Sequence, residues 1–414
     1  MTQYQALKIM LAGNNIFLTG PPGSGKTFLL NKFIQETKRR GKSIAIAASS
    51  GIAATYLNGT TIHSWSGIGI KDSMSVKEIL KVSENIRVIN NYLLTDVLVI
   101  DEVSMLDSAR LDLINDIAKT VRRKNVPMGG IQLVLVGDLF QLPPVTSRDK
   151  AYIFHSKVWS LLNLKICYLS EQHRQYQGDE LNPILSAIRG NRVSQTELAV
   201  LQSKIKPRYL IKDNILRLYS HNFDANNLNN RQLDLLKTKE KTYKMRTKGD
   251  KSEISKLKKA LLSPELIRLK KGSEVMFTAN NYRSGYVNGD RGRVVGFRGG
   301  LPIIRMKRSA YIIVEPFRWQ VEINSRVIAE AWQLPLKLAW AITIHKSQGM
   351  SLEEAVIDLS RAFSTGMGYV ALSRLKSIDG LYLLGLNRMA LYVDSEILKL
   401  DKTLRAESDR LVLR

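Results

Sequence analysis

The chain has 414 residues, more than one hydrophobic core usually supports, so two or three domains are expected. Its 62 lysines and arginines exceed its 37 aspartates and glutamates and give a formal net charge of +25, which favours a polyanionic partner over a generic basic surface. A lone cysteine, Cys167, excludes an internal disulfide, and the lack of a secretory signal or a long apolar run predicts a soluble intracellular protein without a membrane span.

Short apolar runs alternate with stretches of helical spacing through the first part of the chain. The apolar runs are residues 15–19, 44–48, 97–100 and 132–136, and the helical stretches include residues 27–40 and 108–122. This alternation predicts a parallel sheet covered by helices. Because several runs end in a polar residue, we expect the chemistry at the carboxyl edge of the sheet.

A phosphate-binding loop follows the first apolar run. It comprises Gly20, Pro21, Pro22, Gly23, Ser24, Gly25, Lys26 and Thr27, and all of these except Pro21 are expected to contact the nucleotide. The glycines allow backbone N–H groups to close around phosphate, and Lys26 would reach the β and γ oxygens while Thr27 ligates Mg²⁺. The loop lies between a predicted strand and a predicted helix, as the motif requires.

Two later strand ends complete a predicted ATP-hydrolysis site. Asp101 would hold Mg²⁺, and Glu102 would orient or deprotonate the attacking water. Gln141 follows the next strand and could sense the γ-phosphate or serve only structure. Mg²⁺ is the one metal expected, since five scattered histidines and one cysteine offer no zinc-ligand spacing.

A second group of apolar runs predicts another α/β lobe, which lacks a phosphate loop. These runs are residues 215–219, 339–344, 355–359 and 381–384. The lysine-rich residues 237–259 are interpreted as a solvated helix or linker, and residues 274–297 as a small β insertion with a hairpin turn at Asn288-Gly289. Arg174 and Arg374 are candidate arginine fingers, with surface salt bridges as the alternative.

Two similar segments are candidate DNA grips, one in each lobe. The first contains Thr61, His63 and Ser64, and the second contains Thr343, His345, Lys346 and Ser347. We hypothesise that their hydroxyls and imidazoles contact strand phosphates, although a shared tripeptide can arise by chance. Trp65 is the first candidate for base stacking, followed by Phe140 and Tyr282, with core packing as the alternative for Trp65.

Several ordered motifs together resemble the Pif1-like DNA helicases of superfamily 1B, the group that includes the Dda and RecD2 helicases. Besides the loop at residues 20–27, they are Gln3 with Ala6-Leu7, residues 50–54 with 60–64, residues 101–105, residues 129–138, residues 341–349 and residues 369–374. The resemblance runs nearly from end to end.

The resemblance implies an α/β fold with two RecA-like lobes that share one ATP. It implies domain 1A at residues 1–60 and 96–168, a wedge insertion 1B at 61–95, domain 2A at 169–267 and 334–396, an SH3-like insertion 2B at 268–333 and a tail at 397–414. Gln3 would read adenine, Gln141 would couple hydrolysis to movement, and Arg174 and Arg374 would contact the γ-phosphate from the second lobe.

The implied activity is ATP- and Mg²⁺-dependent 5′-to-3′ movement along single-stranded DNA with unwinding of duplex or forked DNA. Roles in DNA repair, recombination and telomere maintenance are also implied, for a monomer that could dimerise on DNA. The alternatives are a DNA-stimulated translocase that does not separate strands, a ring-forming P-loop motor and a nucleotide-switched DNA-binding protein. The two arginine candidates argue against the ring, which usually takes its arginine from a neighbouring subunit.

Overall fold

The computed structural model divides into two units. Unit 1 contains Met1–Ile205, Ser351–Glu353 and Leu359–Arg414, and unit 2 contains Lys206–Met350 and Glu354–Asp358. The structure describes all residues except 58, 70, 145–150, 172–178, 208–210, 212–213, 282, 307–309, 324–325 and 413–414.

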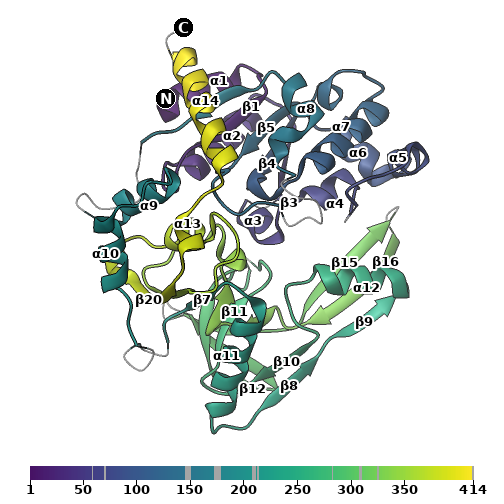
Figure 1. The fold of residues 1–414 in the computed structure, drawn as a ribbon. Coiled ribbons are helices and arrows are strands. Elements are labelled where there is room, and N and C mark those ends of the chain that lie inside the picture. The colour runs from purple at the N-terminus through teal and green to yellow at the C-terminus, as the bar shows by residue number, and fades with distance from the viewer. Residues whose placement is uncertain are drawn as a thin grey trace. The chain divides into compact units, whose positions relative to one another are not determined.

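A six-stranded parallel sheet lies at the centre of unit 1 (Figure 1). Its strands are β1 (Ile16–Thr19), β2 (Ile44–Ala48), β3 (Thr60–Thr61), β4 (Val97–Asp101), β5 (Gln132–Val136) and β6 (Lys165–Tyr168), in the order β3-β2-β4-β5-β1-β6. Every neighbouring pair is parallel. The predicted parallel sheet is therefore confirmed, and β5 lies between β1 and β4, so three polar strand ends meet at one edge.

Helices make up much of the rest of unit 1. They are α1 (Gln3–Leu11), α2 (Lys26–Arg39), α3 (Gly51–Tyr56), α4 (Ile62–Ser66), α5 (Val76–Ser83), α6 (Ile86–Leu93), α7 (Ser108–Arg122), α8 (Lys157–Leu161), α9 (Leu181–Arg189), α10 (Gln195–Ser203), α13 (Met367–Leu372) and α14 (Ser395–Val412). Apolar residues of α1 and α2 form one core with β1, β4 and β5. No helix in the described part of the chain is long and apolar enough to cross a bilayer.

The predicted tail begins at residue 397, and its residues 397–412 form most of helix α14 (Figure 1). This helix packs on the edge strand β6. Ile397 and Leu404 are buried, and the Ser408 hydroxyl accepts a hydrogen bond from the Tyr168 amide. The helix therefore belongs to unit 1. Its apolar positions at helical spacing explain this packing.

The parallel part of unit 2 consists of three strands and one long helix. The strands are β7 (Arg217–Tyr219), β18 (Ala341–Thr343) and β19 (Ala355–Leu359), and the helix is α11 (Asn222–Leu235). Strand β7 pairs in parallel with both β18 and β19. The predicted strand-like run at residues 381–384 lies within strand β20 (Leu381–Leu386), which belongs to unit 1.

Antiparallel strands make up most of the remainder of unit 2. They are β8 (Lys241–Lys244), β9 (Arg246–Gly249), β10 (Leu266–Leu269), β11 (Glu274–Phe277), β12 (Arg291–Arg298), β13 (Leu301–Met306), β14 (Tyr311–Ile313), β15 (Phe317–Ile323), β16 (Arg326–Gln333) and β17 (Leu336–Leu338). They form sheets in the orders β14-β13-β12-β11-β17, β15-β16-β9 and β10-β8.

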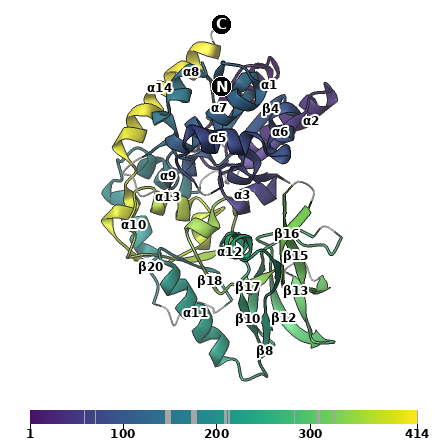
Figure 2. The same ribbon diagram turned by 90° about the vertical axis from the view of Figure 1, so that its right-hand side faces the viewer.

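The lysine-rich residues 237–259 differ in part from the expected helix or linker. Helix α12 (Lys251–Ala260) confirms a helix, and Figure 2 shows it beside β16, which it contacts. Residues 241–249 instead contribute strands β8 and β9, because partner strands that are distant in sequence supply their hydrogen bonds.

Candidate nucleotide site and strand-binding segments

The phosphate-binding loop connects the buried strand β1 to helix α2. Gly20 has a φ of 149°, and a Cβ atom there would lie 2.4 Å from the Leu169 carbonyl oxygen, so the backbone requires glycine. The Lys26 ammonium donates to the carbonyl oxygens of Gly20 at 2.8 Å and Pro21 at 2.9 Å. The Ser24 hydroxyl is buried without a partner among the described residues. The loop therefore holds a polar group available to a ligand.

Gln3 lies beside this loop. Helix α1 begins at Gln3 and is stabilised by a capping box between Thr2 and Gln5. The Gln3 side-chain amide donates to the Ser24 carbonyl oxygen at 3.5 Å. The fold thus brings the predicted adenine-reading glutamine to the phosphate loop.

Asp101 and Glu102 end strand β4 at the same edge of the sheet. The Asp101 carboxylate accepts from the Glu102 amide at 2.8 Å. Glu102 has a φ of 52°, a left-handed conformation that is uncommon outside glycine, and the Ser49 hydroxyl donates to its carbonyl oxygen at 2.5 Å. One carboxylate oxygen of Glu102 is buried without a described partner. This backbone holds the Glu102 side chain at the edge rather than in the strand.

Burial raises the pKa values of both carboxyl groups. Burial and then the charge of Glu102 raise the pKa of Asp101 to about 7. Burial also raises the pKa of Glu102, against the opposing charges of Arg374 and Lys26. Burial lowers the pKa of Lys26 despite the nearby charge of Asp138. The nearby opposite charges therefore do not fully offset the burial of Asp101, Glu102 and Lys26. This is expected at a sheet edge that binds a metal cation and an anionic ligand.

Helix α13 brings Arg374 to the nucleotide edge of unit 1. Gly366 caps the helix at a φ of 79°, and a Cβ atom there would lie 2.7 Å from the Phe140 carbonyl oxygen. Arg374 is 3% exposed, and its guanidinium donates to the Val370 carbonyl oxygen at 2.9 Å and to the Ser373 hydroxyl at 2.7 Å. Its charge lowers the pKa of Glu102. Arg374 is therefore an interior cation near the carboxylate pair, and the surface salt bridge is excluded for it.

Gln141 follows β5 in the loop that α13 contacts. Its side chain is buried, and its Oε1 atom has no partner among the described residues. Arg174, the other predicted finger, and Tyr282, a candidate for base stacking, lie outside the described residues.

A buried arginine that the sequence interpretation missed lies next to this site. Arg189 donates to Asp138 at 2.8 Å, Asp401 at 3.1 Å, the Tyr369 hydroxyl at 2.7 Å and the Tyr168 hydroxyl at 2.9 Å. Its guanidinium also lies 3.9 Å from the centre of the Phe140 ring, which is consequently buried as part of this cluster rather than exposed for base stacking. Nothing in the spacing around Arg189 signals this role, because its partners come from four separate segments of the chain.

Removing Arg189 is expected to destabilise the fold strongly. In Arg189→Ala, the buried carboxylate of Asp138 would lose its ion-pair partner, which typically costs about 3–5 kcal/mol. Asp401 would keep its ion pair with Arg405 at 2.7 Å. Urea unfolding should show this loss, whereas Arg192→Ala at a neighbouring exposed arginine should match the wild-type chain. Equal unfolding midpoints for the two variants would contradict the interpretation of the cluster as a structural link.

The first candidate grip begins helix α4 after strand β3. The Thr61 hydroxyl accepts from the Ser64 amide at 3.3 Å, and the exposed Ser64 hydroxyl accepts from Arg87 at 3.4 Å. Burial, with the charge of Arg110, lowers the pKa of His63. The segment thus presents a polar helix start with a neutral imidazole.

Trp65 packs in the core, which supports the alternative to base stacking. It is 6% exposed, and its ring lies 4.6 Å from the ring of Tyr92. The side-chain amide of Asn91 donates to its carbonyl oxygen at 2.7 Å. The apolar surface of Trp65 therefore packs inside unit 1, where it is not available to a base.

Substitutions at Trp65 are expected to act through stability. Trp65→Ala should cost about 3–5 kcal/mol by leaving a cavity, whereas Trp65→Phe should retain most of the packing. Chemical denaturation measures both, together with single-strand affinity. If Trp65→Phe kept wild-type stability but lost affinity for single-stranded DNA, Trp65 would instead be a base-stacking residue.

The second candidate grip repeats the local geometry of the first within unit 2. Strand β18 ends at Thr343, and a short 3-10 helix follows at His345–Ser347. The Thr343 hydroxyl accepts from the Lys346 amide at 3.4 Å, as Thr61 does three residues before Ser64. Ser347 is fully buried and donates to the Ile344 carbonyl oxygen, so its hydroxyl serves the turn. Burial lowers the pKa of His345 and of Lys346.

Comparison with known proteins decides the family. Residues 4–186 match the PIF1-like helicase family. A Psychrobacter protein named ATP-dependent DNA helicase Pif1 is 40% identical over 95% of this chain and 69% of its own length. The chain belongs to the Pif1-like helicase family. The predicted family is therefore confirmed.

Solved Pif1 structures match nearly the whole chain. The crystal structure of Pif1 helicase from Candida albicans has a TM-score of 0.88 and 30% identity, covering 97% of this chain and 98% of that chain. Pif1 helicase from Bacteroides in complex with ADP-AlF3 and single-stranded DNA has a TM-score of 0.75 and 28% identity, covering 98% of each. The fold class of Pif1 helicases, with RecA-like lobes, is thereby confirmed. The chain spans 60–69% of the length of the first curated Pif1 relatives that it matches.

Proposed function

We propose that this chain is an ATP-dependent DNA helicase that moves 5′ to 3′ along single-stranded DNA and unwinds duplex or forked DNA in an intracellular compartment. The observation that carries the proposal is a set of buried polar atoms at one sheet edge that have no hydrogen-bond partner among the residues that the structure describes. These are Ser24 Oγ, Glu102 Oε2 and Gln141 Oε1. They follow β1, β4 and β5, which are neighbours in the sheet. A buried polar atom without a hydrogen bond destabilises the fold, unless a bound ligand supplies the missing bond.

The residues at this edge fit a magnesium-bound ATP. Lys26 and the glycine-rich backbone suit the phosphates, Gln3 suits the base, and the oxygens of Thr27 and Asp101 suit Mg²⁺. When bound, Mg²⁺-ATP supplies the electrophilic phosphorus and the charge neutralisation needed for hydrolysis. The raised pKa of Asp101, at about 7, reflects a buried carboxyl group whose ionised form a divalent cation would stabilise.

Each chemical role then falls to a particular side chain. Glu102 holds the attacking water and accepts its proton, because its free carboxylate oxygen lies at the edge. Lys26 and Arg374 supply positive charge beside Glu102. Gln141 supplies an uncharged amide that can exchange hydrogen bonds as the phosphates change. Arg174 would add a second cation.

We propose that the two grip segments hold the strand. Thr61, Ser64, Thr343 and Lys346 present hydroxyl and ammonium groups at matched helix starts, and such groups bind phosphates without reading sequence. Opening one base-pair step costs about 1.4 kcal/mol on average, so trapping frayed ends during each advance suffices for unwinding. Residues 61–95 as wedge, the antiparallel strands as an SH3-like support and a monomer as the active form remain parts of this proposal.

An ATPase assay with and without single-stranded DNA tests the function. We expect little turnover alone, strong stimulation by an oligonucleotide, and strand separation of tailed duplexes, all absent in Lys26→Ala. Stimulation without strand separation would favour a translocase. Turnover that ignores DNA would favour a nucleotide-switched binding protein.

A further inference from the structure

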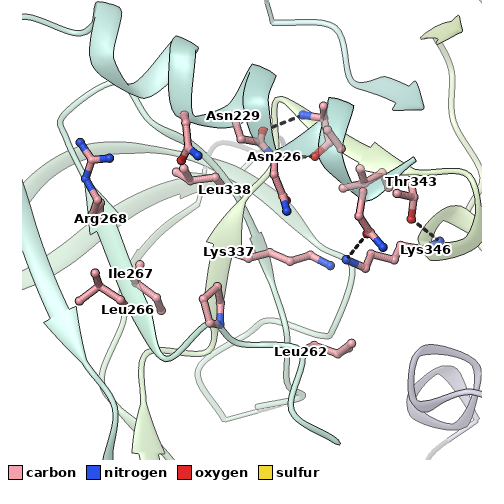
Figure 3. A pocket seen from close by; sticks show the side chains of 16 residues that line it. Asn226, Asn229, Leu262, Leu266, Ile267, Arg268, Lys337, Leu338, Thr343 and Lys346 are labelled. Carbon is pink, nitrogen blue, oxygen red and sulfur yellow. Dashed lines mark hydrogen bonds between the residues drawn. The ribbon is translucent and has the colours of Figure 1, made fainter. Parts of the chain in front are cut away.

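Unit 2 contains a cavity of about 340 Å³ that the nucleotide chemistry does not use (Figure 3). Helix α11 forms one wall, β10 and β17 form the floor, and Thr343 and Lys346 of the second grip lie at one end. Its volume is within the range of pockets that hold a small ligand. The cavity is therefore a candidate binding site that adjoins the grip.

Two ammonium groups lie at the grip end of the cavity. Lys337 extends from β17 towards Lys346 in Figure 3. Lys346 donates to the side chain of Asn222 at 3.0 Å, whereas Lys337 has no hydrogen-bond or ion-pair partner among the residues that the structure describes. Burial, followed by the charge of Lys346, lowers the pKa of Lys337 to about 8. This end of the cavity thus lacks an anion.

The third positively charged side chain of the cavity, Arg268, already has carboxylate partners. Arg268 lies away from the two lysines in Figure 3 and pairs with Asp234 and Glu240, each at 2.9 Å. The unmet positive charge is therefore concentrated at Lys337 and Lys346.

Amide side chains form the wall that α11 contributes. Asn222, Asn226 and Asn230 are spaced four residues apart, so they share one helix face. Asn229 instead binds both backbone groups of Ala341, at 2.9 Å each, and is structural. Asn226 projects towards the cavity in Figure 3. An amide both donates and accepts, so this wall can pair with the polar edge of any base.

We propose that this cavity binds one nucleotide unit of the translocated strand, with its phosphate between Lys337 and Lys346 and its sugar and base edge against Asn226 and Asn230. The proposal rests on the proposed DNA function and adds Lys337 and the α11 amides to the grip. A phosphate supplies the anion that the two ammonium groups lack. The amide wall explains binding without a sequence preference.

A strand containing one uncharged linkage tests the position of the phosphate. Fluorescence anisotropy would follow an oligothymidylate with a single methylphosphonate moved along the backbone. In the wild-type chain, we expect one position to weaken binding about tenfold, the value of one charge-assisted hydrogen bond. Lys337→Gln should bind the all-phosphate strand about tenfold less tightly, lower the salt slope by about one and become insensitive to that same position.

Matched variants separate this contact from general charge and from folding. Lys239→Gln removes one exposed charge of unit 2 outside the cavity and should retain the sensitive position. Asn226→Ala, at an exposed helix residue, should weaken binding without changing the melting temperature. Millimolar inorganic phosphate, at matched ionic strength, should not displace the strand. Displacement would identify a free-anion site and overturn the proposal.

The pH dependence gives a second readout. The charged or titratable groups on the elements around Lys337 are Asp224, Arg231 and Asp234 on α11, Arg268 on β10, Glu274 on β11, and His345 and Lys346 after β18. Glu274 is paired with Arg293 at 2.7 Å. A bound phosphate favours protonated Lys337 and raises its pKa above the free value of about 8. Strand affinity should therefore decline above about pH 8 in the wild-type chain and less steeply in Lys337→Arg, in which only Lys346 of this pair still titrates.

The outcomes distinguish this inference from the underlying function. If Lys337→Gln matches Lys239→Gln at every strand position while unwinding persists, the cavity proposal fails and the helicase proposal stands. If the wild-type chain does not bind the oligonucleotide, both fail.

Discussion

Glu102→Gln is expected to reduce DNA-stimulated ATP turnover by about 10²–10⁴, the usual contribution of a positioned general base. The amide keeps the size of the side chain but cannot accept the proton of the attacking water. Because burial raises the pKa of Glu102, its ionised form carries an energetic cost in the folded chain at neutral pH. The variant should therefore melt at the same or a higher temperature. Single-turnover kinetics and calorimetry measure the two effects.

The combination of lost turnover and retained stability separates catalysis from structure. ATP affinity should remain near the wild-type value, since Lys26 and the loop are unchanged. A Glu102→Gln chain that hydrolyses ATP at the wild-type rate would remove Glu102 from the mechanism.

Arg374→Ala is expected to lower kcat by about 10³–10⁵, as for other arginine fingers. Removing this cation also removes the charge that lowers the pKa of Glu102. Glu102 would then ionise at higher pH, so the acidic limb of the pH–rate profile should move towards higher pH. A steady-state pH profile of the ATPase measures this shift.

Two further variants show whether geometry or charge matters at Arg374. Arg374→Lys keeps a positive charge without the planar guanidinium and should recover the pH profile but only part of kcat. Arg388→Ala, at an exposed arginine of the same unit, should behave as wild type. A kcat for Arg374→Ala within threefold of the Arg388→Ala value would exclude the finger role.

The parallel sheet and its reactive edge could be predicted because local sequence carries their signals. Strands β2, β5 and β19 have the predicted bounds, as does helix α7. Buried parallel strands produce continuous apolar runs, and a phosphate loop has a fixed spacing of glycine, lysine and threonine. Proximity of Asp101 and Lys26 followed from the rule that parallel strands end at a common edge.

The features that could not be predicted depend on contacts between distant segments. The partners of Arg189 lie up to 212 residues away, and no local pattern reports such a cluster. Strands β8 and β9 are polar and exposed along much of their length, so only their pairing with β10 and β16 defines them. Trp65 resembles a stacking residue by its place after the grip, yet the nearby Tyr92 determines its packing.

Unwinding of duplexes with a single-stranded tail at one end tests whether ATP hydrolysis at the Lys26 loop drives movement from 5′ to 3′. A strand-separation assay would compare 5′-tailed and 3′-tailed substrates of the same duplex sequence, with Glu102→Gln as the hydrolysis-deficient control. We expect ATP-dependent unwinding of the 5′-tailed substrate by the wild-type chain and none by the variant. Unwinding of the 3′-tailed substrate alone would overturn the polarity, and equal unwinding by Glu102→Gln would overturn the dependence on hydrolysis.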